Sequence, residues 1–249
     1  MTSAEIAVVV TGASAILALA HTWIACYPAA MCNLYSMTMA RQAMLRLFRV
    51  SDNRATAFDP LPAIFPGHVA PVVRMAGDGE RELVTMNWGF ILLQDGRAPR
   101  RVTNTRDDKM DSRFWKASLE QRRCLVPASS FCEPRDGVKP ATWHWFSLAG
   151  DEPRPPFAFA GLWLRWRGPV KKDGPSVEQD VYSFMTTAPN SATSSINHER
   201  SPVLLATDDE RDTWLRGTSA EASKIIRPIS GDRLRMVQEG LEKRDLLVA

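Results

Sequence analysis

Four polar side chains interrupt apolar stretches of this sequence and are of the types that carry out chemistry: Cys32, Asn104, Glu133 and His198. A cysteine, a glutamate and a histidine together supply a nucleophile, a carboxylate and a group that exchanges protons near pH 7. An asparagine adds a neutral group that orients a substrate or a catalytic partner. Each residue alone has a plainer explanation, such as a small buried side chain for the cysteine or a turn for the asparagine. As a set they favour a cysteine-dependent enzyme over a purely structural protein.

Cys32 follows a methionine in the stretch "AAMCNLYS", which runs from Ala29 to Ser36. If Met31 is the true first residue and is removed, Cys32 becomes the amino terminus. It would then carry a free amine and a thiol on adjacent carbons. An α-amine has a pKa near 8, so a large part of it is neutral and nucleophilic near pH 7.

The segment before Met31 differs from the rest of the chain, because residues 6–30 are nearly all apolar or small and Glu5 is the only charge. A secretory signal would need a basic amino-terminal region, and none is present. About 20 apolar residues suffice for a membrane-spanning helix, but polar residues, Gly12 and Pro28 interrupt this run. The third interpretation is that translation starts at Met31. We expect residues 1–30 to be a mis-assigned start or a removable leader, and residues 31–249 to be the catalytic domain.

The composition is that of an ordinary globular protein. A chain of 249 residues is long enough to bury a substantial core without disulfides, and its 45% hydrophobic and 24% charged residues are typical of soluble proteins. The net charge of +3 is too small to argue for nucleic-acid binding by itself.

The cysteines and histidines do not have the spacing of a metal site. The cysteine spacings C-x5-C and C-x7-C are not those of zinc fingers or ribbons, and the four histidines are scattered. We therefore expect no metal and no cofactor, and a reducing, cytoplasmic compartment. The residues concerned are Cys26, Cys32, Cys124, Cys132, His21, His68, His144 and His198.

Strands outnumber helices in the predicted elements. An amphipathic helix is expected over about residues 39–49, and shorter helices over 193–196, 208–216 and 219–225. Strands are predicted over residues 69–75 and 81–90, and these two pair as a hairpin. Residues 122–134 are predicted to form a short buried strand followed by a loop. Further strands are predicted within 141–150, 156–166 and 181–190. Helices and strands do not alternate regularly. The predicted fold is therefore α+β, one domain around a mostly antiparallel, barrel-like sheet flanked by helices.

Several ordered motifs resemble one known family, the SOS response-associated peptidases, also called abasic-site processing proteins. In chain order the motifs are "MCNLYS", "MNWGF", "TNTRDD", "RRCLVPASSFCEP", "FAFAGLW", "FMTTAPN" and "NHERSPVLL". The resemblance covers about residues 31–229 and leaves the apolar leader outside. It implies a compact α+β fold with a barrel-like core and a positively charged groove.

The resemblance also implies roles for individual residues. Cys32 would be the catalytic cysteine, with Asn104, Glu133 and His198 around it. Arg106 and Arg200 would contact phosphates, and Trp88 would stack on a base. Arg113 and Thr187 complete the DNA-binding set that we expect.

The sequence departs from the family pattern at three places. Asn33-Leu34 replaces a common Gly-Arg after the cysteine, Cys132 and Pro134 replace an aromatic pair around Glu133, and Ser201 stands where methionine is common. These changes affect expected substrate contacts and remove no catalytic side chain.

Members of this family link covalently to abasic sites in single-stranded DNA, and the resemblance implies the same here. The amine of an amino-terminal Cys32 would form a Schiff base with the open aldehyde of the sugar, and the thiol would close a thiazolidine ring. The expected protein is a cytoplasmic, nucleoid-associated monomer, acting in the SOS response, with no membrane partner unless the leader is genuine. Two alternatives stay open: a thiol peptidase, acting on itself or on other proteins through Cys32, His198 and Glu133, and a non-catalytic single-stranded DNA binding module.

Overall fold

The core of the molecule is a five-stranded barrel. The computed structural model describes residues 32–55, 57–135 and 137–246. The barrel order is β5-β4-β9-β12-β13, with antiparallel neighbours, and a parallel pairing of β13 with β5 closes the ring. Its strands are β4 (Val69–Met75), β5 (Arg81–Trp88), β9 (Arg123–Ala128), β12 (Phe157–Pro169) and β13 (Ser176–Thr187).

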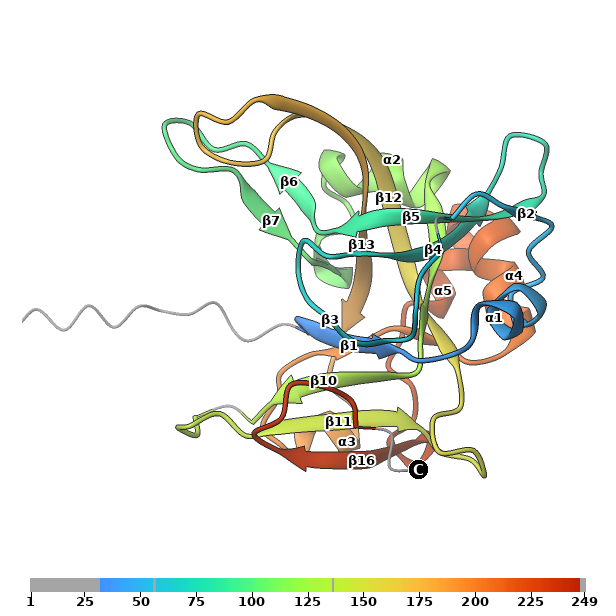
Figure 1. Cartoon of the computed structure of the whole chain (residues 1–249), viewed down its shortest axis with the longest axis vertical. Coiled ribbons are helices and arrows are strands. Elements are labelled where there is room, and N and C mark those ends of the chain that lie inside the picture. The colour runs from blue at the N-terminus through green and yellow to red at the C-terminus, as the bar shows by residue number, and fades with distance from the viewer. Residues whose placement is uncertain (1–31, 56, 136, 247–249) are drawn as a thin grey trace, which may run out of the picture.

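A second sheet lies beside the barrel, as Figure 1 shows, with the order β16-β11-β10-β1-β3. Only Ser129 separates β9 in the barrel from β10 in this sheet, so one stretch of chain serves both layers. Pro62 lies in the edge strand, where a residue without an N–H is tolerated. The strands are β1 (Leu34–Met37), β3 (Leu61–Ile64), β10 (Ser130–Pro134), β11 (Trp143–Leu148) and β16 (Leu234–Gly240).

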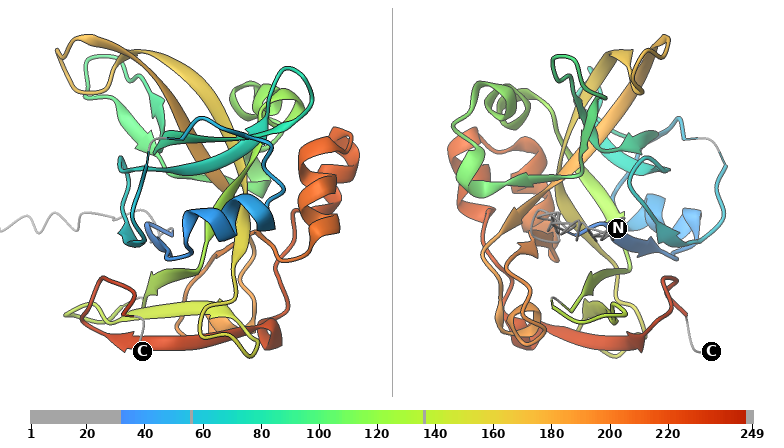
Figure 2. Two further views of the ribbon diagram at one scale, coloured as in Figure 1. Left: turned by 45° about the vertical axis from the view of Figure 1, so that its right-hand side comes forward. Right: turned by 90° about the vertical axis from the view of Figure 1, so that its left-hand side faces the viewer.

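The helices lie outside the barrel (Figure 2). The last two begin with capping boxes, in which a threonine hydroxyl and a glutamate carboxylate satisfy free backbone N–H groups. Trp214 fixes α4 to the barrel, because its indole N–H lies 3.0 Å from the carbonyl oxygen of Cys124. The helices are α1 (Arg41–Leu47), α2 (Arg113–Gln121), α3 (Ser191–Ser194), α4 (Asp208–Arg216) and α5 (Ser219–Ile225), with 3-10 turns η1 (Asp107–Lys109) and η2 (Gly231–Arg233).

Short strands extend the barrel sheet. β8 runs parallel to β13 and places Asn104 opposite Phe184, while β14 and β15 pair with β13 and β12. β2 pairs with β5, and β6 and β7 form a separate hairpin. Their bounds are β2 (Asp52–Asn53), β6 (Phe90–Leu92), β7 (Arg100–Val102), β8 (Asn104–Arg106), β14 (Ser201–Pro202) and β15 (Leu204–Leu205).

Aromatic rings fill the space between the barrel and β1. Tyr35 meets Trp88 edge-on with ring centroids 5.1 Å apart, and Phe159 stacks on Phe184 at 4.3 Å. The hydroxyl oxygens of Tyr35 and Tyr182 lie 2.5 Å apart, so the polar ends of two buried rings satisfy each other. This packing ties the first strand, which carries Cys32 at its start, to the closed barrel.

The predicted fold class is confirmed, and most elements agree with their predicted positions. Helices α4 and α5 have the predicted bounds, and the hairpin of β4 and β5 pairs Met75 with Arg81 and Val69 with Asn87. The loop expected after the strand near residue 125 is wrong, because residues 130–134 form β10. Helix α2 and strand β16 were not predicted, because their polar residues weaken the apolar pattern. No helix among the described residues is long and apolar enough to cross a membrane.

Replacing Gly161 by alanine is expected to destabilise the barrel. A Cβ atom there would lie 2.7 Å from Sγ of Cys124 and 2.8 Å from Cγ2 of Val126. Overpacking of this kind costs about 1–3 kcal/mol, measured as the free energy of unfolding in urea. Gly77→Ala is the control, because a Cβ there meets nothing within 4 Å. Equal stability of the two variants would contradict this packing.

Candidate active site

Cys32 lies two residues before β1, and its thiol is buried, with Sγ 3.8 Å from the carbonyl oxygen of Leu34. Burial raises the pKa of this thiol well above its ordinary value, because a thiolate would lose its water. The Glu133 carboxylate raises the pKa further by its negative charge and by its hydrogen bond with the thiol. Cys32 is therefore held as a neutral thiol at neutral pH.

Glu133 and His198 form a buried pair beside this thiol. Nε2 of His198 lies 3.1 Å from Oε2 of Glu133, and the two side chains are 0% and 1% exposed. Glu133 comes from β10, whereas His198 follows α3, so the pair joins segments far apart in sequence. Inside a protein, where the effective dielectric constant is low, such a contact between a carboxylate and an imidazole is stronger than in water.

A sharp turn brings His198 to this position. Asn190 caps α3 by accepting from the N–H of Thr193, and the N–H of His198 donates back to the carbonyl of Thr193 at 3.1 Å. Asn197 has a φ of 59°, in the left-handed region that asparagine tolerates better than most residues. The sequence "SINH" thus reverses the chain and directs the imidazole inward.

Asn104 holds the backbone of Cys32. Its Nδ2 donates to the carbonyl oxygen of Cys32 at 2.7 Å and lies 3.0 Å from Oγ1 of Thr103. Thr103 in turn donates to Oδ1 of Asn33 at 3.0 Å. Oδ1 of Asn104 is buried and has no hydrogen-bond partner among the described residues, which leaves one acceptor next to the cysteine.

The two arginines expected to contact phosphates are paired with neighbouring carboxylates. Arg106 makes two hydrogen bonds to Asp108, of 2.9 and 2.7 Å, and its side chain is 42% exposed. Arg200 is 13% exposed and bonds Asp107 at 2.5 Å and the carbonyl of Thr186 at 2.6 Å. The guanidinium of Arg106 lowers the pKa of Asp108 to about 2.

The other expected DNA contacts differ in accessibility. Thr187 is buried, and its hydroxyl donates to Asp107 at 2.8 Å, whereas Arg113 is exposed at the start of α2. Trp88 is 0% exposed, stacks on Phe184 at 5.3 Å and donates its indole N–H to the carbonyl of Thr103. The expectation that Trp88 stacks on a base is therefore corrected: its ring faces are covered by the core, and it supports the Thr103–Asn104 segment instead.

The structure brings Cys32, Asn104, Glu133 and His198 together, as the resemblance implied. Sequence reasoning missed the supporting roles of Thr103 and Asp107, although both lie in or beside the motif "TNTRDD". The described residues contain no group of three or more His, Cys, Asp or Glu that could hold a metal ion. The chemistry of the site is thus that of a neutral thiol, a proton-exchanging pair and a backbone clamp.

An α+β barrel with a buried cysteine set against a Glu–His pair defines a protein with a thiol-centred site. The model of the SOS response associated peptidase (SRAP) family matches residues 31–239. The chain belongs to this family, which confirms the resemblance seen in its motifs. The match begins at the Met31–Cys32 junction, and the predicted leader of residues 1–30 lies outside the described residues.

Solved structures share the fold at low sequence identity. A protein from Bordetella bronchiseptica has a TM-score of 0.63 and 21% identity, covering 82% of this chain and 97% of its own. A protein from Bacteroides thetaiotaomicron has a TM-score of 0.65 and 21% identity, covering 82% and 90%. A phage-related protein from Bordetella bronchiseptica has a TM-score of 0.60 and 19% identity, covering 82% and 92%. A search of curated proteins gives no match.

The raised pKa of Cys32 predicts slow alkylation by iodoacetamide. At pH 8 we expect the folded protein to react at Cys32 at least about tenfold more slowly than the urea-unfolded chain, because only the thiolate is the nucleophile. Glu133→Gln removes a negative charge beside the thiol, so it lowers the pKa and speeds the reaction. Peptide mass mapping identifies the labelled cysteine. Glu120→Gln, an exposed change on α2, is the control, and equal rates in both variants would contradict this electrostatic coupling.

Proposed function

We propose that this protein captures abasic sites in single-stranded DNA by a covalent bond to Cys32 at a free amino terminus. One observation carries the proposal: the main-chain carbonyl and the thiol of the same residue are both contacted by polar side chains. Asn104 binds the Cys32 carbonyl at 2.7 Å, and Glu133, paired with His198, lies beside its thiol. A site built only around a thiol would not need to fix the main chain of the cysteine.

The proposed reaction joins an aldehyde, an amine and a thiol. The α-amine of Cys32 attacks the open aldehyde of the abasic sugar, and loss of water gives a Schiff base. The thiol then adds to the same carbon and closes a five-membered thiazolidine. The C=O bond is broken, and C–N and C–S bonds form. Of the three protons on nitrogen and sulfur, two leave in the water and one stays on the ring nitrogen. The second step is intramolecular and gains from a high effective concentration.

The buried pair would manage these protons. Glu133 lies where it can give a proton to the departing hydroxyl of the carbinolamine and receive one from the thiol. His198, 3.1 Å away, holds the shared proton between these steps. Asn104 offers its buried Oδ1 to an N–H of the free amine, which would keep the amine beside the site.

The neutral state of the thiol favours this chemistry over that of a thiol peptidase. A peptidase needs a thiolate for its first attack, and its cysteine has a lowered pKa. Here burial and Glu133 raise the pKa of Cys32. In the proposed capture the amine attacks first, and the thiol adds later to an imine carbon with Glu133 present to take its proton. The second candidate function is cleavage of the chain's own peptide bond before Cys32, which would use the same three residues, Cys32, Glu133 and His198.

Of the three arginines in the expected DNA-binding set, Arg106 and Arg113 are the accessible ones. Arg106 is bound to Asp108, so a phosphate must replace a carboxylate as its partner. Such an exchange gives binding that is independent of base sequence and sensitive to salt. Arg200, mostly buried against Asp107, would act by fixing the segment that carries His198.

Crosslinking tests the proposal directly. A chain that begins at Met31 contains every described helix and strand, and its methionine is removable because cysteine has a small side chain. Incubated with an abasic single-stranded oligonucleotide, it is expected to form a complex that survives a denaturing gel. Cys32→Ala keeps the amine but loses the thiol, so the stable complex should disappear. Cys124→Ala, which removes a thiol in the barrel wall, is the matched control.

A blocking residue separates the candidates. One glycine placed between Met31 and Cys32 removes the cysteine amine but keeps the thiol. Capture of abasic sites should then be lost, whereas a peptidase would keep its activity on peptide bonds. A full yield of complex from the blocked chain, or none from the unblocked one, contradicts the proposed function.

Arg106→Gln is expected to weaken binding to unmodified single-stranded DNA severalfold. Loss of one phosphate contact also makes the slope of log K against log salt shallower by about 0.7. Fluorescence anisotropy over a salt series measures both quantities. Arg227→Gln is the control, because this exposed arginine follows α5, lies 3.6 Å from Glu210 and is not one of the expected DNA contacts. If the two variants have the same slope of log K against log salt, Arg106 does not contact the DNA backbone.

A further inference from the structure

His144 is a buried histidine that the proposed reaction does not use. It lies in β11 with 2% of its surface exposed. In the register of the second sheet it stands directly opposite Glu133 on β10. Directly opposite residues of an antiparallel pair lie on the same face, with Cβ atoms about 4.5–5.5 Å apart. The imidazole and the catalytic carboxylate are therefore neighbours on the face that the barrel covers.

The row continues to the surface on the next strand. Glu239 of β16 stands opposite His144, and its Oε1 lies 3.3 Å from Nε2 of His144. The Glu239 side chain is 57% exposed. Figure 1 shows β10, β11 and β16 side by side in this order. Three titratable side chains thus run across three strands, from a buried carboxyl to one in water.

The second imidazole nitrogen of His144, Nδ1, is the atom that could pass a proton from Glu239 towards Glu133. Nδ1 of His144 is buried and has no hydrogen-bond partner among the described residues. Nε2 is taken by Glu239, so Nδ1 is the nitrogen left for an inner partner. If the contact between His144 and Glu239 were only structural, Nδ1 would be buried without a hydrogen bond, which costs desolvation free energy. An imidazole that receives a proton on one nitrogen and gives one from the other uses both.

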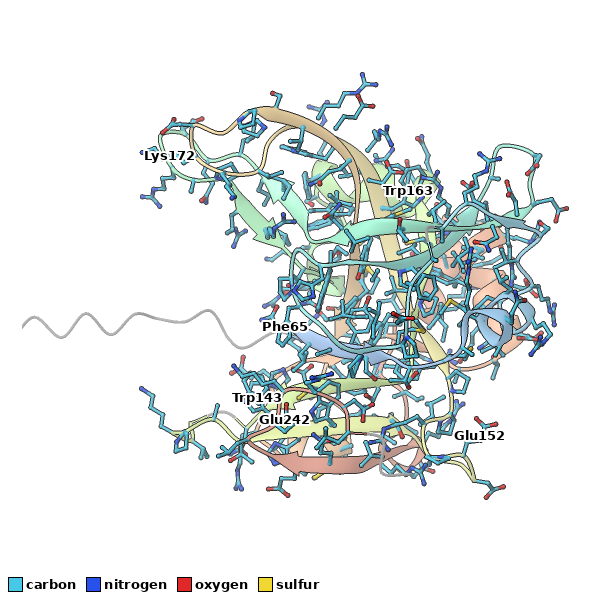
Figure 3. The ribbon with its side chains drawn as sticks, viewed as in Figure 1. Phe65, Trp143, Glu152, Trp163, Lys172 and Glu242 are labelled. Carbon is cyan, nitrogen blue, oxygen red and sulfur yellow. The ribbon has the colours of Figure 1, made fainter. Side chains whose placement is uncertain are left out.

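Few other charged groups face this row. His198 and Cys32 lie beyond Glu133 at its inner end. On the opposite face, next to buried Cys132, lie Lys243 and Asp245; Lys243 also stands 4.8 Å over the ring of Trp143. Figure 3 shows Trp143 and Glu242 near each other at the end of the sheet where β11 begins, and Glu242 is exposed.

We propose that His144 and Glu239 form a proton relay that connects Glu133 with solvent, an inference that rests on the proposed capture of abasic sites. When Glu133 gives its proton to the departing hydroxyl, the His144 imidazolium replaces it from Nδ1. His144 then regains a proton at Nε2 from solvent, through the exposed carboxylate of Glu239. When the thiol adds, Glu133 passes a proton back along the row to solvent and takes the proton of the thiol, so one capture takes up no net proton. The relay lets Glu133 exchange protons with solvent although its own side chain is buried.

The relay is tested by the rate of capture in single-turnover experiments across about pH 5.5 to 9. Glu239→Gln preserves size and a hydrogen bond to His144 but cannot carry a proton. We expect it, and His144→Gln, to slow capture at neutral pH by about tenfold, with an unchanged final yield. A high concentration of small buffer acids should restore part of the rate. Glu242→Gln, an exposed acid on the same segment, should react like the parent chain.

The outcomes separate this inference from the function on which it rests. No complex from the parent chain overturns both. A parent that captures abasic sites, with both variants equally fast, overturns the relay alone. Slowing that is the same at every pH, insensitive to buffer and accompanied by a lower Tm assigns His144 a structural role and also overturns it. Glu239 is exposed, so its variant keeps the test valid even if His144→Gln does not fold.

Discussion

The parallel pairing of β13 with β5 is the contact on which this structure depends. It closes the barrel by setting Tyr182 beside Trp88. The same β13 pairs with β8 and so fixes Asn104 opposite Phe184. Its far end pairs with β14, directly after the turn that carries His198. A strand with this many partners has one register, because a shift by one residue would move every side chain to the wrong face.

Burial decides what chemistry the site supports. Cys32, Glu133 and His198 are all nearly inaccessible, so an isolated charge on any of them would be costly. The glutamate and histidine stabilise each other, and the thiol stays neutral beside them. Such a site suits a reaction in which the amine begins and the thiol completes. It suits poorly a reaction that needs a thiolate from the start.

The acidic residues near the site have two different functions. Asp107 accepts from both Arg200 and Thr187, and it therefore connects η1 with the segment that ends in His198. Asp108 forms an ion pair with the exposed Arg106, which could exchange this carboxylate for a phosphate. Exposed ion pairs contribute little to stability, so exchanging Asp108 for a phosphate costs little, whereas breaking the mostly buried Asp107–Arg200 pair would disturb the site. These contacts leave Arg200 mostly buried, which is why the proposed function gives it a positioning role, although its sequence position resembles that of a phosphate contact.

The sequence by itself determined the family, the fold class, the barrel strands and the four residues that the structure brings together at the candidate site. These depend on local signals: apolar alternation, capping residues such as Thr207 and Glu210, and motifs of contiguous residues. Sequence reasoning could not predict that Trp88 lies inside the core, because an aromatic residue before a glycine suits a binding face or a buried strand equally well. It also missed β10 as a strand, since "SSFCEP" has no regular polar alternation when both faces are covered. Only the tertiary structure placed His144 between Glu133 and Glu239, because the register of β11 against β16 depends on pairing between segments about a hundred residues apart.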